Sequence, residues 1–143
     1  MWPTVDGRYS PAVGREQLDN VRRSLEAWNR GDLDALLDDV HPESEYMVAE
    51  ESPNHQVLRG REAIAAYMRD WRQTITGMHY EILEQRDAGD SVVTIGRMTG
   101  RAGDDGPEVT VELAFVSRFD GADVVRTEEY LDADRALAAA GLA

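Results

Sequence analysis

The chain has 143 residues, a length that fits one domain and leaves no room for two ordinary ones. Its net charge of −13 disfavours anionic partners, namely nucleic acid and the anionic surface of a membrane. It has no cysteine and no apolar run near the roughly 18 residues of a membrane span, so we expect a cytoplasmic domain of bacterial type without disulfides or thiolate metal ligands.

The first residues are predicted to be irregular and the next to be helical. Residues 1–14 are expected to form an N-terminal arm, because two prolines and a glycine interrupt any regular period. Residues 15–30 are predicted to form a helix that ends at Gly31. The apolar residues of this helix recur at helical spacing and are Leu18, Val21, Leu25 and Trp28.

A second helix is predicted over residues 33–40, with Asp32 as its N-cap and the pair His41–Pro42 as its end. Residues 45–48 are predicted to form a short strand, and residues 49–60 a polar loop. A third helix follows Gly60. Its apolar face is strong and consists of Ile64, Tyr67, Met68, Trp71 and Ile75.

After Gly77 the apolar period changes from helical to alternating. This pattern predicts four strands, at about 79–87, 91–101, 108–119 and 123–131, which short turns rich in glycine and aspartate connect. A short helix over residues 132–140 is predicted to close the chain. We therefore expect residues 15–142 to form a single domain, with helices in its N-terminal half and an antiparallel meander in its C-terminal half.

Helices and strands that are segregated along the chain in this way are typical of an α+β domain. We expect the three N-terminal helices to wrap one face of a curved sheet that is antiparallel or mixed. Such a sheet and its helices enclose a cone with an open mouth, which is a natural pocket for a small molecule. The predicted ligand is small and largely apolar.

Four stretches of the sequence carry a resemblance to a known family. The stretches are Ala27–Leu36, Leu58–Ile64, Asp87–Val93 and Phe119–Leu142. With the order of elements, they resemble the SnoaL-like and ketosteroid isomerase-like branch of the nuclear transport factor 2-like superfamily, which has a cystatin-like fold. The resemblance implies the cone-shaped sheet and a polyketide-like or steroid-like ligand. It does not fix the activity, because this scaffold hosts isomerases, cyclases, epoxide hydrolases, dehydratases and non-catalytic binders.

The resemblance implies a carboxylate base after the first strand, where Glu50 or Glu51 lies. The family's isomerases also use a tyrosine and a protonated aspartate as oxyanion donors. Here those two positions hold Ser24 and Phe115, so steroid isomerisation is not expected. Proton transfer by Glu50 or Glu51 remains the leading prediction for the catalytic step.

Arg97 and Glu112 are predicted to face one another across a hairpin in which residue 101 pairs with residue 108. A site of the limonene epoxide hydrolase type uses an arginine between carboxylates, and would require both side chains to point into the cone. An ordinary cross-strand ion pair is the favoured interpretation, because structural ion pairs are common.

The remaining candidates are residues that could bind a substrate. They are Tyr46, His55, Tyr67, Trp71, Glu128 and Tyr130. Glu128 and Glu129 alternate across the last strand, so one of them points inward in any register. An inward glutamate has a raised pKa, and it either pairs with an arginine or serves as an acid–base group.

Three functions are therefore kept as hypotheses. The first is a SnoaL-like enzyme of isomerase, cyclase or dehydratase type, which moves a proton with a carboxylate and uses neither cofactor nor metal. The second is a non-catalytic ligand-binding or accessory protein. The third is an epoxide hydrolase-like site at Arg97 and Glu112.

A homodimer built sheet against sheet is also predicted. Helices are expected to cover only one face of the meander, which leaves apolar side chains on the other. These are Val93, Ile95, Ala114 and Val116, on the same face as Arg97 and Glu112. An exposed apolar sheet of that extent usually marks an interface.

Overall fold

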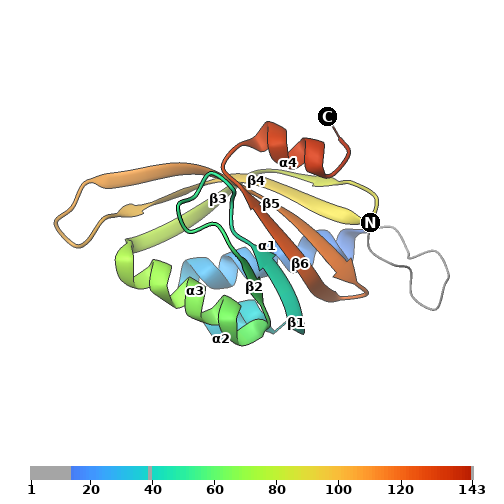
Figure 1. The fold of residues 1–143 in the computed structure, drawn as a ribbon, viewed down its shortest axis with the longest axis horizontal. Helices are drawn as coiled ribbons and strands as arrows, with labels where there is room; N and C mark the ends of the chain where they lie inside the picture. Colours follow the sequence, from blue (N-terminus) through green and yellow to red (C-terminus); the bar gives the residue numbers. More distant parts are fainter. Residues whose placement is uncertain (1–13, 39, 143) are drawn as a thin grey trace.

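The computed structural model describes residues 14–38 and 40–142 (Figure 1). The predicted N-terminal arm lies outside these residues, apart from Gly14. The elements in chain order are α1 (Arg15–Arg30), α2 (Leu33–Leu37), β1 (Val40–Met47), β2 (Val57–Arg59), α3 (Arg61–Thr74), β3 (Thr76–Asp87), β4 (Ser91–Arg101), β5 (Glu108–Asp120), β6 (Asp123–Tyr130) and α4 (Ala133–Ala139).

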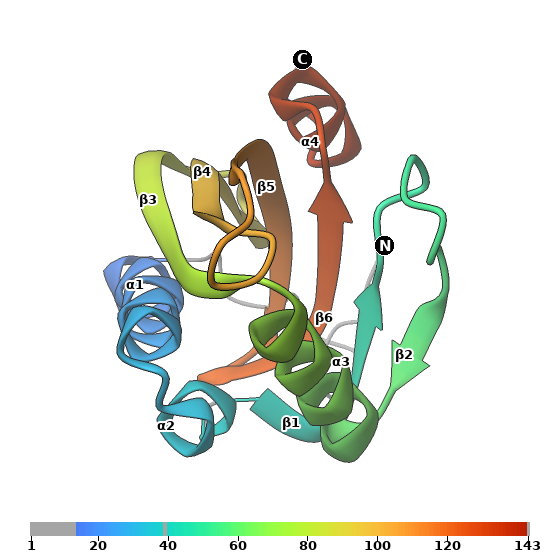
Figure 2. The same ribbon diagram turned by 90° about the vertical axis from the view of Figure 1, so that its left-hand side faces the viewer.

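The strands form one mixed sheet in the order β2-β1-β6-β5-β4-β3. Every neighbouring pair is antiparallel except β1 and β6, which run parallel. Figure 2 shows the sheet curving around α3, with α1 and α2 beside it. The predicted α+β fold with a curved sheet wrapped by three N-terminal helices is therefore confirmed.

The local signals in the first half of the chain act as expected. Gly31 ends α1 in the left-handed conformation, with φ of 78°, which glycine adopts at no steric cost. Asp32 caps α2, and its side chain accepts a hydrogen bond of 3.1 Å from the Ala35 N–H. This sharp turn places α1 and α2 on the same side of the sheet as α3 (Figure 1).

Two boundaries differ from the prediction. The second helix ends at Leu37, and β1 already begins at Val40, because residue 40 pairs with Val124 of the parallel strand β6. The predicted loop over residues 49–60 ends in the short strand β2, which pairs with β1. Three paired residues are too few to show an alternating pattern, so β2 leaves no signal in the sequence.

The outer face of the sheet is partly covered by α4, which Figure 1 shows on the side opposite α1, α2 and α3. Val93, Ala114 and Val116 are fully buried beneath it. The residues that pack against them include Ala136, Leu137, Ala140 and Leu142. The prediction that helices cover only one face is therefore wrong, because the small residues of α4 allow the helix to lie close to these strands.

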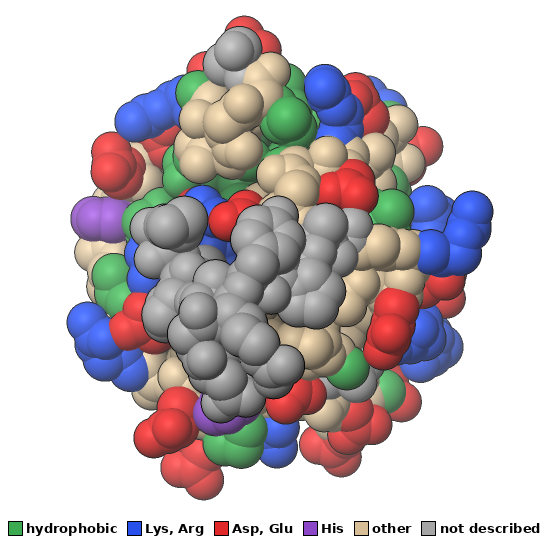
Figure 3. Space-filling view, turned by 90° about the vertical axis from the view of Figure 1, so that its right-hand side faces the viewer, with side chains coloured by type: hydrophobic (Ala, Val, Ile, Leu, Met, Phe, Trp, Pro, Cys, Tyr) green, Lys and Arg blue, Asp and Glu red, His purple; other side chains and the backbone are tan. Residues whose placement is uncertain are grey.

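Figure 3 shows one face of the molecule. On the face in Figure 3, acidic and basic side chains are interspersed, with small hydrophobic groups between them. Over the described residues, no helix has the length and apolarity that crossing a membrane requires.

Candidate functional site

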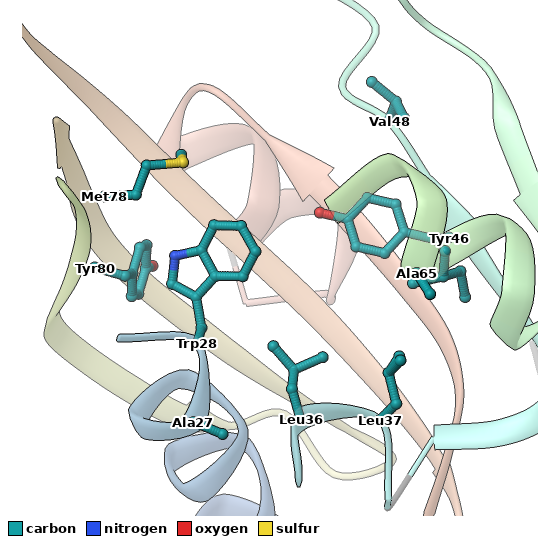
Figure 4. Packing of buried hydrophobic residues seen from close by; sticks show 10 residues of the cluster. Ala27, Trp28, Leu36, Leu37, Tyr46, Val48, Ala65, Met78 and Tyr80 are labelled. Carbon is teal, nitrogen blue, oxygen red and sulfur yellow. The ribbon is translucent and has the colours of Figure 1, made fainter. Parts of the chain in front are cut away.

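A cavity of about 400 Å³ lies between the three N-terminal helices and the inner face of the sheet. This volume lies in the range of sites that bind drug-sized molecules. Figure 4 shows Trp28 of α1 and Tyr46 of β1 projecting toward one another above Leu36 of α2. All three residues line the cavity.

The wall of the cavity is largely aromatic and thioether in character. The aromatic rings that line it include Trp28, Tyr46, Tyr67, Trp71 and Phe115, and the thioethers are Met68, Met78 and Met98. Flexible methionines adapt to ligands of irregular shape, whereas the rings give rigid apolar surface. The cavity is therefore suited to a largely apolar molecule.

Glu129 supplies the buried carboxylate of this cavity. Its register partner on β5 is Phe115, which also faces inward, whereas the neighbouring Glu128 pairs with the outward Val116. Only 7% of Glu129 is exposed. The alternation of the strand therefore places Glu129 inside and Glu128 outside, which settles the choice that the sequence left open.

Three neutral donors hold the Glu129 carboxylate. The Tyr46 hydroxyl donates to Oε2 at 2.5 Å, and the Ala49 N–H donates to Oε1 at 3.3 Å. The Tyr67 hydroxyl lies 3.4 Å from Oε1 and 3.3 Å from Oε2. Tyr46 is therefore committed to the carboxylate, whereas the longer contacts leave Tyr67 free to turn toward a ligand.

Burial raises the pKa of the Glu129 carboxyl above its ordinary value of 4.5, and the hydrogen bonds from Tyr46, Ala49 and Tyr67 offset part of this rise. Burial also raises the pKa values of the Tyr46 and Tyr67 hydroxyls, and the negative charge of Glu129 is the second-largest cause of this rise. Glu129 is thus a stronger base than an exposed glutamate, and both tyrosines keep their protons at neutral pH. This combination is suited to acid–base chemistry.

The positions that correspond to the isomerase oxyanion donors do lie in the cavity, since Ser24 and Phe115 both line it. Neither carries a phenol or a carboxyl group. The phenolic hydroxyls of the site come instead from Tyr46 on β1 and Tyr67 on α3. The predicted substrate-binding residues Tyr46, Tyr67 and Trp71 are therefore brought together on one wall.

The predicted base residues Glu50 and Glu51 lie in the loop between β1 and β2. Both pair with Arg135 of α4, at 3.2 Å for Glu50. The Glu50 side chain is 61% exposed, whereas Glu51 is 32% exposed and lines the cavity together with Ser52 and Pro53. Glu51 thus borders the cavity, and Glu50 projects into solvent.

Arg97 and Glu112 are paired in register as predicted, in a hairpin where Arg101 pairs with Glu108. Neither side chain lines the cavity. Arg97 forms an ion pair with Glu81 at 2.9 Å, and Glu112 accepts a hydrogen bond from the Ala133 N–H at the start of α4. Both therefore lie on the outer face, and the condition for an epoxide hydrolase-like site is not met.

The other three candidates also lie away from the cavity. His55 is exposed, and its Nδ1 lies 2.7 Å from the Val48 carbonyl oxygen. Glu128 forms an ion pair with Arg126 at 3.0 Å and a longer one with Arg118. The Tyr130 hydroxyl donates to Glu128 on the same outer face. None of these groups is placed to touch a ligand in the cavity.

In residues 14–38 and 40–142, no group of three histidine, aspartate or glutamate side chains is arranged to hold a metal ion.

Comparison with known proteins identifies the family and the fold. A family model for the SnoaL-like domain matches residues 21–127. No curated protein matches the chain at a significant level.

Several solved structures share the fold. A nuclear transport factor 2-like protein of unknown function from Burkholderia pseudomallei has 23% identity and a TM-score of 0.74, over 87% of this chain and 97% of that one. A putative SnoaL-like polyketide cyclase from Jannaschia has 17% identity and a TM-score of 0.72, over 85% and 88%. A protein of ketosteroid isomerase-like fold from Catenulispora acidiphila, in complex with trimethylamine, has 22% identity and a TM-score of 0.70, over 87% and 94%.

Proposed function

Because the chain belongs to the SnoaL-like domain family, we propose that it is a small-molecule enzyme in which Glu129 transfers a proton. The substrate is small and largely apolar, of the polyketide-like or steroid-like type, and the reaction is an isomerisation, cyclisation or dehydration without a cofactor. The observation that carries the proposal is the buried Glu129 carboxylate, which faces an apolar cavity and is held by two tyrosines.

The geometry supports a division of roles between these three side chains. Glu129 accepts a proton from a carbon next to a carbonyl group and can return it to another position of the same molecule. The Tyr67 hydroxyl donates to the carbonyl oxygen, where negative charge develops. The Tyr46 hydroxyl stays on Glu129 Oε2 and fixes the orientation of the carboxylate. In this role Tyr46 is a positioning residue.

Exchange of substrate protons with solvent tests the proposal without knowledge of the natural substrate. A panel of cyclic ketones and enones is incubated with the protein in D₂O, and deuterium uptake next to the carbonyl is followed by NMR. Glu129→Gln should slow enzyme-dependent uptake by about 10²- to 10⁴-fold, the usual contribution of a general base. Because burial raises the pKa of Glu129, the acidic limb of the rate profile should lie above pH 4.5.

Two further variants make this test specific. Glu128→Gln removes a charge from the adjacent residue on the outer face and should leave uptake unchanged. Tyr67→Phe should lower the rate by about 10²-fold, the usual cost of one oxyanion donor. Uptake by wild type that persists in Glu129→Gln would assign the proton transfer to another group and refute the proposal.

A second candidate function is non-catalytic ligand binding, which the strongly apolar wall of the cavity favours. A binding protein needs only the shape of the cavity and its few polar contacts. It predicts that apolar molecules bind while no member of the panel exchanges protons, in wild type or in Glu129→Gln. The deuterium experiment therefore separates the two functions.

We also propose a homodimer through the part of the outer face that α4 leaves uncovered. This part carries the exposed Arg97, which pairs with Glu81 within the chain and lies opposite Glu112 in register. Light scattering is expected to give a mass near twice the 16.0 kDa of one chain. Arg97→Glu should return the mass to one chain, because it places like charges together at the interface. A wild-type mass of one chain contradicts the dimer.

A further inference from the structure

The charged groups that line the cavity are all of one sign. In the described part of the chain, the lining contains two charged side chains, Glu51 and Glu129, and no arginine or histidine. Two arginines contact residues of the lining without lining the cavity themselves. Arg72 packs 4.7 Å from the centre of the Trp28 ring and donates to the Trp28 carbonyl, and Arg135 is held by Glu50 and Glu51.

Glu129 is therefore a buried carboxylate that no positive charge accompanies inside the cavity. Its hydrogen-bond partners are Tyr46, Tyr67 and the Ala49 N–H, which are all neutral. Neutral donors compensate a buried carboxylate only in part, and the favourable complement is a cation that also donates hydrogen bonds. An ammonium group on a ligand supplies both.

The surroundings of Glu129 favour a cation as well. The Tyr46 and Tyr67 rings lie 5.4 Å apart and are tilted, and the Trp71 ring meets Tyr67 edge-on at 6.3 Å. The faces of tyrosine and tryptophan rings attract cations, most strongly where water is excluded. A carboxylate or phosphate on a ligand would instead meet the like charge of Glu129 in a medium of low dielectric constant.

We propose that the cavity selects its ligand by charge and takes a largely apolar molecule that carries one protonated amine, directed to Glu129. This inference deepens the proposed function and rests on it, because the same carboxylate binds the amine. Anionic molecules of the same size are excluded. The negative charge of the whole protein acts in the same direction, since it raises the local concentration of cations.

Three probes with one hydrocarbon skeleton test this selection: naphthylmethylamine, naphthylmethanol and naphthoate. Calorimetric titration at neutral pH should show that the amine binds about 10- to 100-fold more tightly than the alcohol, as expected for a hydrogen bond between charged groups. The naphthoate should show no measurable binding. An alcohol that binds as tightly as the amine, or a naphthoate that binds as tightly as the alcohol, overturns the proposal.

Variants then locate the selection at Glu129. Glu129→Gln should weaken binding of the amine at least about 10-fold and change binding of the alcohol less than about 2-fold, so that the alcohol reports an intact cavity. Glu128→Gln, which removes a neighbouring charge on the outer face, should preserve the amine preference. A preference that survives in Glu129→Gln refutes the inference.

These binding measurements need no turnover, so the amine proposal can fail while the proposed proton transfer holds, and the reverse. If the amine is preferred but no proton exchange occurs, the amine site is supported and the enzymatic function is refuted. If proton exchange depends on Glu129 but the amine is not preferred, the enzymatic function is supported and the amine site is refuted.

Discussion

Replacing Gly96 by alanine is expected to destabilise the protein by about 3 kcal/mol or more, at the upper end of what overpacking costs. A Cβ atom at this position would lie 2.3 Å from the Glu81 carbonyl oxygen and 2.5 Å from the Tyr80 ring. Both are fixed, because Glu81 belongs to the paired strand β3 and the Tyr80 hydroxyl donates to the Leu113 carbonyl at 2.6 Å. Neither can move without disturbing the sheet.

The effect of Gly96→Ala should extend to the cavity. The Tyr80 ring packs on Phe115 at 5.5 Å between centres, and Phe115 lines the cavity opposite Glu129 in register. Urea denaturation measures the loss of stability, and binding of an apolar ligand to the folded fraction reports the cavity. Gly14→Ala is the control, because among the residues that the structure describes the nearest atom to its added Cβ lies 3.9 Å away. A loss below about 1 kcal/mol in Gly96→Ala would contradict this account.

Replacing Val116 by glutamate is expected to destabilise the protein by about 4 kcal/mol or more, in the range reserved for buried charges without a partner. Val116 is fully buried on the outer face, in the apolar cluster that includes Val93, Ala114 and Ala136. A glutamate there either keeps its charge in an apolar environment or forces α4 away from the sheet. Both responses lower the free energy of unfolding.

Val57 is a matched control for Val116, because the same substitution is made there at a valine that is 39% exposed on β2. Val57→Glu should change stability by less than about 0.5 kcal/mol. Thermal unfolding of the two variants compares them directly. Equal stability of Val116→Glu and wild type would show that α4 does not seal this face in solution.

The fold is predictable from the sequence because the signals that specify it are local. The helical spacing of Leu18, Val21, Leu25 and Trp28 and the alternating pattern after Gly77 each depend on a few neighbouring residues. The same holds for Gly31 and Asp32, which end one helix and begin the next. The pairing of Arg97 with Glu112 was also predictable, because the length of a turn fixes the register of its hairpin.

The candidate site could be predicted only in part. Tyr67 and Trp71 were found because the apolar face of α3 faces the sheet, and that face also forms the cavity wall. The resemblance placed the base at Glu50 or Glu51, whose loop lies at the border of the cavity. The sequence indicates only that either Glu128 or Glu129 points inward, because the alternation of side chains along a strand does not show which of two neighbouring residues is buried.

The sequence by itself determined the elements other than β2, their order and the α+β class, since these follow from the spacing of apolar residues and from turn chemistry. Only the tertiary structure decided which strand faces point inward, because that depends on the pairing of Glu129 with Phe115 across β5 and β6. It also decided that α4 covers Val93, Ala114 and Val116. Residues 80 or more positions apart, such as Tyr46 and Glu129, meet at 2.5 Å only because the chain returns β6 beside β1.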